Sequence, residues 1–417
     1  MMDVRAFLAD LFKAAVRAAD PILTIAGHLP PVPKGRTVVI GAGKASARMA
    51  SALDERWSGE LAGAVVTRVG YGASCRRIEV IEAAHPVPDL AGLAGAKRLV
   101  ELIAPLSEDD LVIALISGGG SALLPAPPAG LTLADEIALN EALLRSGAPI
   151  AAMNTIRKHL STVKGGRLAA STRAKVHTLV VSDVPGDDAA IVASGPTLPD
   201  ASTRLEALRI VERYHLDLPR VAMEHLFRAD ADAPSPDAPV FARHTHSLIA
   251  SAGLSLAAAA EVARTRGIGA HILSDAIEGE ARDAGAWHAA IAHQMSGNNP
   301  PFARPAVILS GGETTVTLKG KGRGGRNGEF AMALASRIEG LNVVALAADT
   351  DGIDGSEHNA GAFVDGSTAA RLRQAGAEAQ LLLDHNDSFS GFELLNDLFV
   401  TGPTGTNVND FRAMLVQ

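Results

Sequence analysis

Short runs of valine, isoleucine and leucine recur along this 417-residue chain, and each ends in a glycine-rich or polar turn. Clear examples are residues 37–41, 111–117, 178–182, 306–310 and 342–347. The runs do not alternate between apolar and polar residues, so helices are expected to cover both faces of the sheets that they form. Alanine- and leucine-rich stretches follow the runs, which predicts an α/β fold built from strand-helix-strand units.

The length of the chain favours two domains, because 417 residues exceed the size at which one hydrophobic core stops growing. Residues 228–239 are rich in proline, alanine and aspartate and lack apolar periodicity, so the predicted domains are 1–235 and 240–417. Each is expected to hold a mainly parallel, Rossmann-like sheet flanked by helices. Because open α/β sheets bind ligands outside the carboxyl ends of their strands, the active site is expected in an interdomain cleft.

Composition narrows the classes of partner. The net charge of −8 comes without a basic stripe, which disfavours nucleic acid. Cys75 is the only cysteine, so no intrachain disulfide forms and a cytoplasmic location is expected. Phe7, Leu8 and Leu11 have the spacing of an N-terminal surface helix, and no apolar run reaches the roughly 18 residues of a membrane span. The oligomeric state stays open, with a homodimer as one alternative.

A first glycine turn, with Gly41, Gly43 and Lys44, leaves a predicted strand and enters a helix, so its backbone N–H groups are predicted to face a phosphate. The turn lacks the third glycine of a dinucleotide motif and the Gly-Lys-Ser/Thr end of a P-loop. Arg68, after the next strand, suits the 2′-phosphate of NADP, so a reductase stays an alternative. A tight turn with a solvated lysine is the simplest alternative.

A second turn follows another predicted strand and consists of Ser117, Gly118, Gly119, Gly120 and Ser121. Three consecutive glycines let backbone amides approach a polyphosphate, so we predict that these five residues bind nucleotide phosphates. The serines flank the glycines, which does not match the Gly-x-Ser-x-Gly elbow of a serine hydrolase.

Cationic side chains gather in residues 153–167 of an otherwise acidic protein, which favours an anionic ligand. The predicted substrate-binding residues are Asn154, Arg157, Lys158 and Lys164. At helical spacing Arg157 and Lys164 share one face, which would line a cleft. The alternative is a solvated charged face.

Acidic residues follow several strands, an arrangement that typically holds Mg²⁺ beside phosphates. The predicted metal ligands are Asp183, Glu313 and Asp351, and Asp187 is either a site residue or a helix cap. The histidines, His85 among them, lie in separate segments without metal-ligand spacing, which indicates packed or surface side chains.

A third glycine-rich region begins with Gly311 and Gly312 and leads through a loop to Arg326 and Asn327 at the start of a helix. We predict that the two glycines and Asn327 bind phosphate. An arginine at a helix N-terminus opposes the helix dipole unless an anion joins both, so Arg326 is predicted to meet a phosphate or carboxylate. The alternative is an arginine that points to solvent.

Together these motifs resemble the glycerate 2-kinase family with a C-terminal MOFRL domain, whose members have often been labelled hydroxypyruvate reductase. The resemblance spans nearly the whole chain and rests on residues 41–46, 117–122, 154–167, 182–187, 310–313, 324–327 and 349–355. It implies phosphorylation of D-glycerate to 2-phosphoglycerate by ATP with Mg²⁺ or Mn²⁺. It also implies that Lys44 and Arg326 are central to catalysis.

Phosphoryl transfer mainly needs in-line positioning and neutralisation of charge on the phosphoryl oxygens. We expect Lys44 and Arg326, from opposite domains, to supply that charge, and Asp183 or Asp187 to accept the proton of the substrate hydroxyl. The metal is expected on a subset of Asp183, Asp187, Glu313 and Asp351. Two other classes stay open: an NADP-dependent hydroxypyruvate or tartronate semialdehyde reductase, and a non-catalytic phosphometabolite sensor.

Overall fold

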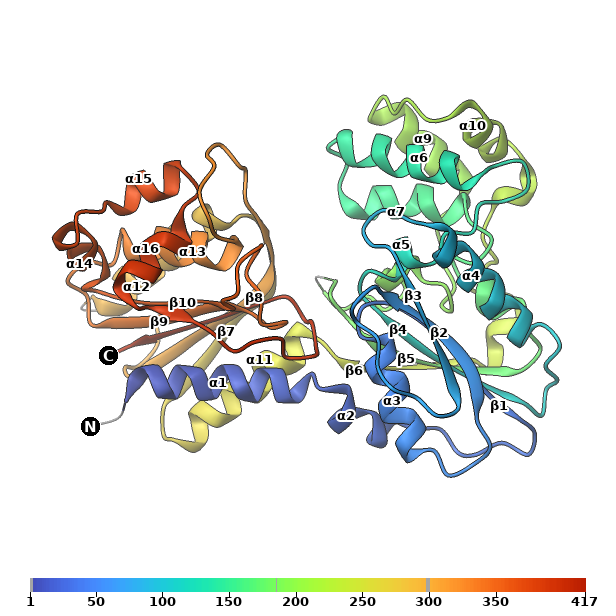
Figure 1. Ribbon diagram of the computed structural model, residues 1–417, viewed down its shortest axis with the longest axis horizontal. Coiled ribbons are helices and arrows are strands. Elements are labelled where there is room, and N and C mark those ends of the chain that lie inside the picture. Colours follow the sequence, from blue (N-terminus) through green and yellow to red (C-terminus); the bar gives the residue numbers. More distant parts are fainter. Residues whose placement is uncertain (1–2, 185, 298–300) are drawn as a thin grey trace. The chain divides into compact units, whose positions relative to one another are not determined.

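The computed structural model describes residues 3–184, 186–297 and 301–417 (Figure 1). The chain forms two compact units. The N-terminal unit comprises Pro21–Ser182 and Asp188–Ile249, and the C-terminal unit comprises Met1–Asp20, Asp183–Asp187 and Ala250–Gln417. The predicted junction at 235–240 therefore lies inside the N-terminal unit, and the first helix belongs to the other unit.

The N-terminal unit holds a six-stranded sheet in the order β3-β2-β1-β4-β5-β6. Its strands are β1 (Thr37–Ala42), β2 (Ala62–Arg68), β3 (Ile78–Ala83), β4 (Leu111–Ser117), β5 (Lys175–Val181) and β6 (Thr245–Ala250). The pairings β1–β2, β2–β3, β1–β4 and β4–β5 are all parallel, which confirms a Rossmann-like α/β sheet. Every residue of β1 and β4 is buried, as expected for strands covered on both faces.

Strand order reverses between β1 and β4, because the chain builds outward from β1 to β3 and then returns to the other side of β1. Such a switch point opens a crevice at the carboxyl ends of the two strands, where ligands of these sheets bind. The first and second glycine turns follow those strand ends, so the topology brings them together.

Helices of the N-terminal unit cover this sheet and form a separate cluster beside it. They are α2 (Pro21–Thr24), α3 (Ser46–Arg56), α4 (Leu90–Ile103), α5 (Gly120–Leu123), α6 (Leu133–Arg145), α7 (Ile150–His159), α8 (Arg167–Ala170), α9 (Arg204–Arg213) and α10 (Arg220–Leu226), with short 3-10 turns at Ile25–His28, Val192–Ser194, Ala229–Ala231 and Pro239–Arg243. Leu139, Ile156, Val211 and Leu226 pack together and join α6, α7, α9 and α10 into the cluster (Figure 1).

The C-terminal unit holds a sheet in the order β11-β10-β9-β12-β8-β7. Its strands are β7 (Gly269–Glu280), β8 (Ala306–Thr315), β9 (Val343–Asp349), β10 (Gly361–Asp365), β11 (Leu398–Phe399) and β12 (Asp410–Val416). Only the β7–β8 pairing is parallel, so the prediction of a second mainly parallel sheet is wrong. The reason lies in β10 and β12, which pair antiparallel with their neighbours. Each follows the preceding strand without the crossover helix that parallel pairing needs.

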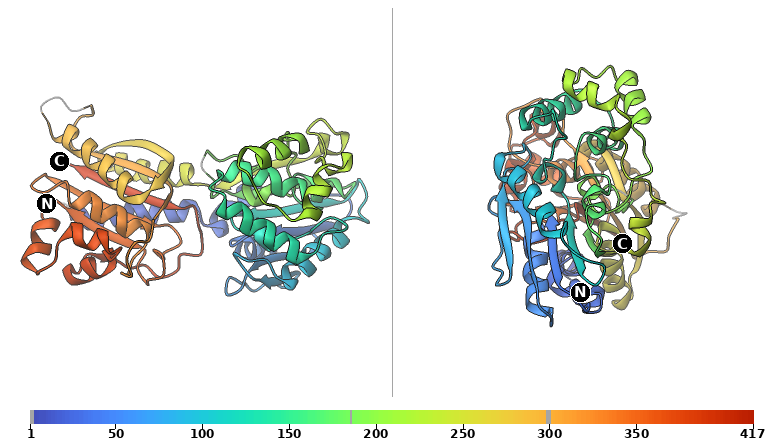
Figure 2. Two further views of the ribbon diagram at one scale, coloured as in Figure 1. Left: turned by 90° about the horizontal axis from the view of Figure 1, so that it is seen from above. Right: turned by 90° about the vertical axis from the view of Figure 1, so that its right-hand side faces the viewer.

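Two layers of helices cover the C-terminal sheet (Figure 1). On one face α1 (Val4–Ala18) packs along α11 (Ala252–Thr265), and the Phe12 ring meets Phe399 and Phe411 edge to face. The other face carries α12 (Ala281–Ser296), α13 (Arg326–Ala335), α14 (Thr368–Gln374), α15 (Ala379–Asp384) and α16 (Ser388–Leu395), seen from above in Figure 2. Among the described residues, none of these helices is long and apolar enough to cross a membrane.

Candidate active site

The two glycine turns at the switch point are bound to each other through their backbones. The N–H groups of Gly43 and Lys44 donate to the carbonyl oxygens of Val66 (3.1 Å) and Gly118 (2.9 Å). The next N–H, of Ala45, donates to the hydroxyl of Ser117 at 3.0 Å. The first turn therefore offers a phosphate none of these N–H groups, contrary to the predicted role of Gly43.

Close packing explains the glycines of the first turn instead. A Cβ on Gly41 would lie 2.5 Å from the carbonyl oxygen of Leu115, and one on Gly43 would lie 2.1 Å from Ser117 Oγ. Gly43 also has a φ of +136°, which side-chain-bearing residues rarely adopt. These glycines, and the Ser117 hydroxyl, serve the contact between β1 and β4 rather than a ligand.

Lys44 projects its side chain from this turn beside the second one. A Cβ on Gly119 would lie 3.3 Å from Lys44 Cγ and 3.0 Å from Nε2 of His85, so all three residues meet. The Lys44 ammonium has no hydrogen-bond or ion-pair partner among the described residues. Burial, together with Lys44 and Arg68, lowers the pKa of His85 to about 4, so its imidazole is neutral at pH 7. His85 is thus a candidate site residue, although the sequence alone indicated a packed or surface side chain.

The second turn continues into α5, whose first N–H groups have no partner within the helix. Ser121 shares a hydrogen bond with Ser194 (2.9 Å between hydroxyl oxygens), and Ser194 donates to Asn154 Oδ1 at 3.4 Å. Ala193 and Ser194 have φ values of +54° and +61°. Left-handed conformations cost such residues about 1 kcal/mol or more each and concentrate at functional sites. Ser194 was missed, although its glycine-proline neighbourhood signals an unusual turn.

Arg157 belongs to the same network of side-chain hydrogen bonds, which links Ser121, Ser194 and Asn154. Its Nη1 donates to Asn154 Oδ1 at 3.2 Å, and its Nε donates to Asn140 Oδ1 at 2.8 Å. Both partners are neutral, and no carboxylate pairs with this half-buried guanidinium in the part of the chain that the structure describes. Burial lowers the pKa of Arg157, although Glu136 opposes the shift. A partly desolvated cation without a counter-ion favours an anionic ligand.

Lys158 and Lys164 do not belong to this site, which corrects their predicted role. Lys158 pairs with Asp200 at 3.2 Å, and Lys164 pairs with Glu136 at 2.9 Å while donating to the Leu124 carbonyl oxygen. Both ammonium groups are buried and engaged in these pairs. The helical spacing of Lys164 and Arg157 was compatible with a shared cleft face, but the acids that bind Lys158 and Lys164 are distant in sequence.

Gly311 and Gly312 lie inside β8 rather than in a phosphate-binding loop. A Cβ on Gly312, where φ is +126°, would lie 2.3 Å from the backbone nitrogen of Ile277 in β7. The β7–β8 register shifts at this point, between Ser274 and Ile277. Close strand pairing therefore explains Gly312 without a ligand, and the phosphate role of Gly311 and Gly312 stays a prediction.

Arg326 begins α13, and each of its three side-chain nitrogens meets a carboxylate. Nε donates to Asp410 (2.6 Å), Nη2 to Asp349 (2.7 Å) and Nη1 to Glu313 (3.0 Å). Burial opposes its charge, but Asp410, Asp349 and Glu313 together raise the pKa of Arg326 above its ordinary value. The anion expected beside this arginine is supplied by the protein itself, and Glu313 is an ion-pair partner.

The N-terminus of α13 is also satisfied internally. Asp354 accepts hydrogen bonds from the N–H groups of Asn327 (2.9 Å) and Gly328 (2.8 Å), and the Asn327 side chain donates to Asp410. The donors of Asn327 are therefore engaged by protein carboxylates, which disfavours its predicted binding of phosphate. Burial raises the pKa of Asp354 to about 6.

The remaining predicted acids lie in the C-terminal unit. Asp183 accepts a hydrogen bond from Asn409 at its carbonyl oxygen, and Asp351 Oδ1 accepts one from the Ile353 N–H (2.9 Å). Asp187 has a φ of +57° and lies beside Gly253. Residue 185 of the same motif is outside the described residues. Among those described, no three histidine, cysteine or acidic side chains lie close enough to hold a metal by themselves.

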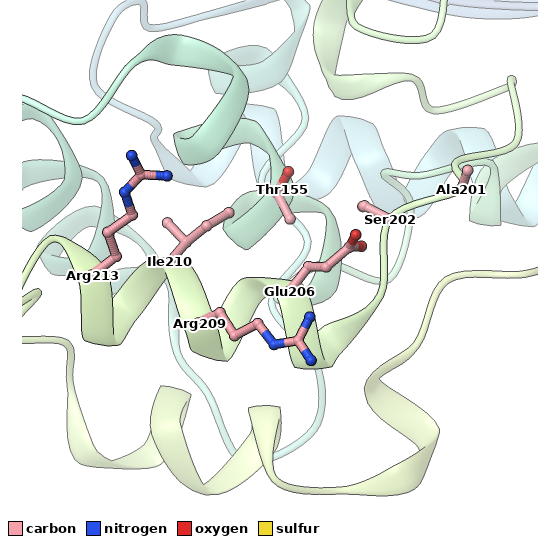
Figure 3. A pocket seen from close by; sticks show the side chains of 7 residues that line it. All are labelled: Thr155, Ala201, Ser202, Glu206, Arg209, Ile210 and Arg213. Carbon is pink, nitrogen blue, oxygen red and sulfur yellow. The ribbon is translucent and has the colours of Figure 1, made fainter.

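A separate surface pocket of about 450 Å³ lies beside α7 and α9 (Figure 3). It is lined by Thr155, Ala201, Ser202, Glu206, Arg209, Ile210 and Arg213, none of which is a predicted site residue. The guanidinium groups of Arg209 and Arg213 point in different directions, so they do not form a joint anion site (Figure 3).

Fold and site together define a two-unit α/β protein with unpaired cations around the switch point of a Rossmann-like sheet. Residues 7–227 match the family described as a domain of unknown function (DUF4147), and residues 306–410 match the MOFRL family. A protein from Agrobacterium vitis, provisionally named a hydroxypyruvate reductase, is 48% identical over 100% of this chain and 95% of its own length.

Two further relatives carry a kinase name. A glycerate 2-kinase from Pyrococcus horikoshii is 38% identical over 100% of this chain and 98% of its own length. The crystal structure of a glycerate kinase from Thermotoga maritima superposes with a TM-score of 0.91 at 37% identity, covering 99% of both chains. The chain belongs to the glycerate 2-kinase family with a C-terminal MOFRL domain, which confirms the resemblance.

Proposed function

We propose that this protein transfers the γ-phosphoryl group of ATP to the 2-hydroxyl of D-glycerate and forms 2-phosphoglycerate. The observation that carries the proposal is the pair of unpaired cations, Lys44 and Arg157, joined through the second glycine turn. ATP and glycerate each bring an anionic group, and each cation suits one of them. The kinase names of relatives that match the whole chain support the same reaction.

Arg157 and Asn154 bind the glycerate carboxylate in this proposal, because a guanidinium binds carboxylate oxygens with two parallel hydrogen bonds. Lys44 lies beside Gly119 and neutralises phosphoryl oxygens, whose charge spreads in the transition state. Neutral His85 adds a hydrogen-bonding group without adding charge. Arg326 contributes a further cation, and its meeting with Lys44 in a cleft stays a prediction.

The acids of this protein can supply part of the coordination of Mg²⁺. Magnesium beside nucleotides needs only one or two protein carboxylates, since phosphates and waters fill its other positions. Asp183, Asp187 and Asp351 are the acids proposed for this role, with Asp183 or Asp187 as the proposed proton acceptor. Glu313 is less suited, because its carboxylate pairs with Arg326. When bound, the ion neutralises charge on the β- and γ-phosphates.

The reductase alternative meets a physical difficulty at the first glycine turn. A Rossmann dinucleotide site binds pyrophosphate through N–H groups of the first strand-helix turn. Here the N–H groups of Gly43, Lys44 and Ala45 donate to protein oxygens. Arg68, the candidate for the NADP 2′-phosphate, lies over the Tyr71 ring at 5.3 Å.

Two parallel assays test the proposal. Purified protein with ATP, Mg²⁺ and D-glycerate is expected to release ADP, and the same protein with NADPH and hydroxypyruvate is expected to leave NADPH absorbance unchanged. NADPH consumption without ADP formation would establish the reductase instead. Absence of both activities would favour the phosphometabolite sensor.

A further inference from the structure

The three carboxylates around Arg326 differ sharply in exposure. The Asp410 and Asp349 side chains, which bind Nε and Nη2, are 0% and 7% exposed, whereas Glu313, which binds Nη1, is 51% exposed. Two edges of the guanidinium are therefore held from inside the protein. The third is held only by a group at the surface.

Asp410 is itself fixed from several directions. It accepts hydrogen bonds from the Thr314 N–H (3.2 Å) and hydroxyl (3.0 Å) and from Asn327 Nδ2 (2.9 Å). It also pairs with Arg412, whose side chain is 2% exposed and lies over the Phe330 ring at 4.8 Å. Burial works against ionisation, but Arg412 and Arg326 keep the pKa of Asp410 below its ordinary value. Releasing Arg326 from Asp410 would leave buried charges unpaired.

Asp349 holds the second edge from the end of β9. Its Oδ2 accepts from Arg326, and its Oδ1 accepts from the N–H of Asp351 at 3.0 Å. Its position is set by a buried strand, because the Asp349 N–H donates to the Ala360 carbonyl oxygen. The position of Asp349 is therefore fixed by the strand as well as by its pair with Arg326.

We propose that Asp410 and Asp349 are positioning residues, which fix Arg326 so that only its Nη1 edge meets an anionic ligand. Glu313 occupies that edge as an exchangeable counter-ion, and a phosphate or carboxylate oxygen of the ligand replaces it. An exposed ion pair contributes little and is given up readily, unlike the buried pairs on the other two edges. The identity of the anion, a phosphate of ATP, rests on the proposed function. The contact geometry of Arg326 does not depend on it.

The decisive variant is Glu313→Gln, which removes an exposed charge and is expected to fold normally. ATP binding is measured by calorimetry without glycerate, with and without Mg²⁺. The expected result is about two- to fivefold tighter binding, since the ligand no longer competes with a carboxylate. Binding equal to or weaker than that of the wild type, or a raised Mg²⁺ requirement, would overturn the proposal, and the latter would restore Glu313 as a metal ligand.

Glu357→Gln is the matched control. Glu357 pairs with Arg323, three residues before Arg326, at 2.7 Å, and its side chain is 15% exposed, so the variant removes one nearby negative charge without touching Arg326. No change in ATP affinity is expected. A gain equal to that of Glu313→Gln would show that general charge, not the Nη1 edge, is responsible, and would overturn the proposal.

A double-mutant cycle separates positioning from mere structural support. The gain from Glu313→Gln is expected to disappear in an Arg326→Ala background and to shrink in Asp349→Asn, where Arg326 is less well fixed. Persistence of the full gain in Arg326→Ala would contradict the proposal. Asp410→Asn is informative only if it folds, and the other variants decide the question without it. Because binding is measured without turnover, failure to phosphorylate glycerate would defeat the proposed function and leave this test intact.

Discussion

The cationic residues of the 157–167 stretch differ in their partners, and this difference separates function from structure. Arg157 meets only the amide oxygens of Asn140 and Asn154, whereas Lys158 and Lys164 are buried against acids. Sequence reasoning identified the stretch but could not divide it, because Asp200 and Glu136 are brought in by the fold. An ammonium group that is buried together with its counter-ion, as in Lys158 and Lys164, is not available to a substrate.

Two variants in this stretch are expected to behave oppositely. Arg157→Gln removes charge-assisted bonds to the substrate, so the KM for glycerate is expected to rise about tenfold to a hundredfold with little change in stability. Lys164→Met leaves Glu136 buried and unpaired, at a cost of about 3–5 kcal/mol. Steady-state kinetics and denaturant unfolding measure the two effects. Equal loss of stability in both variants would contradict the division.

His85 gives the protein a specific dependence on pH. Its pKa is about 4 in the folded protein, below the ordinary value, so folding favours the neutral form. The resulting stability is complete above about pH 6.5 and is lost as the pH falls toward 4. His85→Gln is expected to remove about 1 kcal/mol of the stability difference between pH 7 and pH 5, after discounting for partial exposure. Unfolding curves at both values check this, and an unchanged difference would show that His85 titrates normally.

The glycine turns at strand ends were predicted correctly. The sequence analysis assigned their glycines to phosphate binding, whereas close packing of neighbouring strands explains several of them. The strands before Gly43 and Gly118 follow from the sequence pattern, whereas the strand order that makes a switch point between them does not. The sequence cannot show that β4 approaches β1 closely enough to require Gly41 and Gly43, or that β12 pairs with β8. In a sequence, a glycine that is required because a neighbouring strand packs closely cannot be distinguished from a glycine that lets a phosphate approach the backbone.

Gly312→Ala tests this structural interpretation in the C-terminal unit. The new Cβ would meet the Ile277 backbone at 2.3 Å in a left-handed conformation, so a loss of about 3 kcal/mol or more is expected. Gly340→Ala is the control, because Gly340 has a φ of +78° but open space around it, and about 1 kcal/mol is expected. Similar losses in chemical denaturation would contradict the role of close packing.

At the scale of the whole molecule, the chain crosses between its two units more than once. The first helix, α1, completes one face of the C-terminal sheet, with Phe7, Leu11 and Phe12 buried in its core. Composition locates a proline-rich segment, but it does not show that this segment still belongs to the N-terminal unit or that α1 belongs to the C-terminal one. The predicted boundary at 235–240 therefore falls within the N-terminal unit. The two-unit α/β organisation, by contrast, followed from length and periodicity.

A fragment of residues 240–417 is therefore expected not to fold stably, because it exposes the apolar surface that α1 covers. Joining residues 1–20 to residues 250–417 through a flexible linker is expected to restore a cooperative unfolding transition. Calorimetry and proton NMR dispersion distinguish the outcomes. A shorter fragment that folds as stably as the joined one would contradict the role of α1.

Phosphorus NMR of the reaction product tests the central claim most directly. Wild-type protein with ATP, Mg²⁺ and D-glycerate is expected to give ADP and the resonance of 2-phosphoglycerate. Lys44→Ala, whose truncation opens no core cavity, is expected to stay folded and to lose about a hundredfold or more in rate. A 3-phosphoglycerate resonance, no phosphorylated product, or undiminished turnover by a folded Lys44→Ala variant would contradict the account.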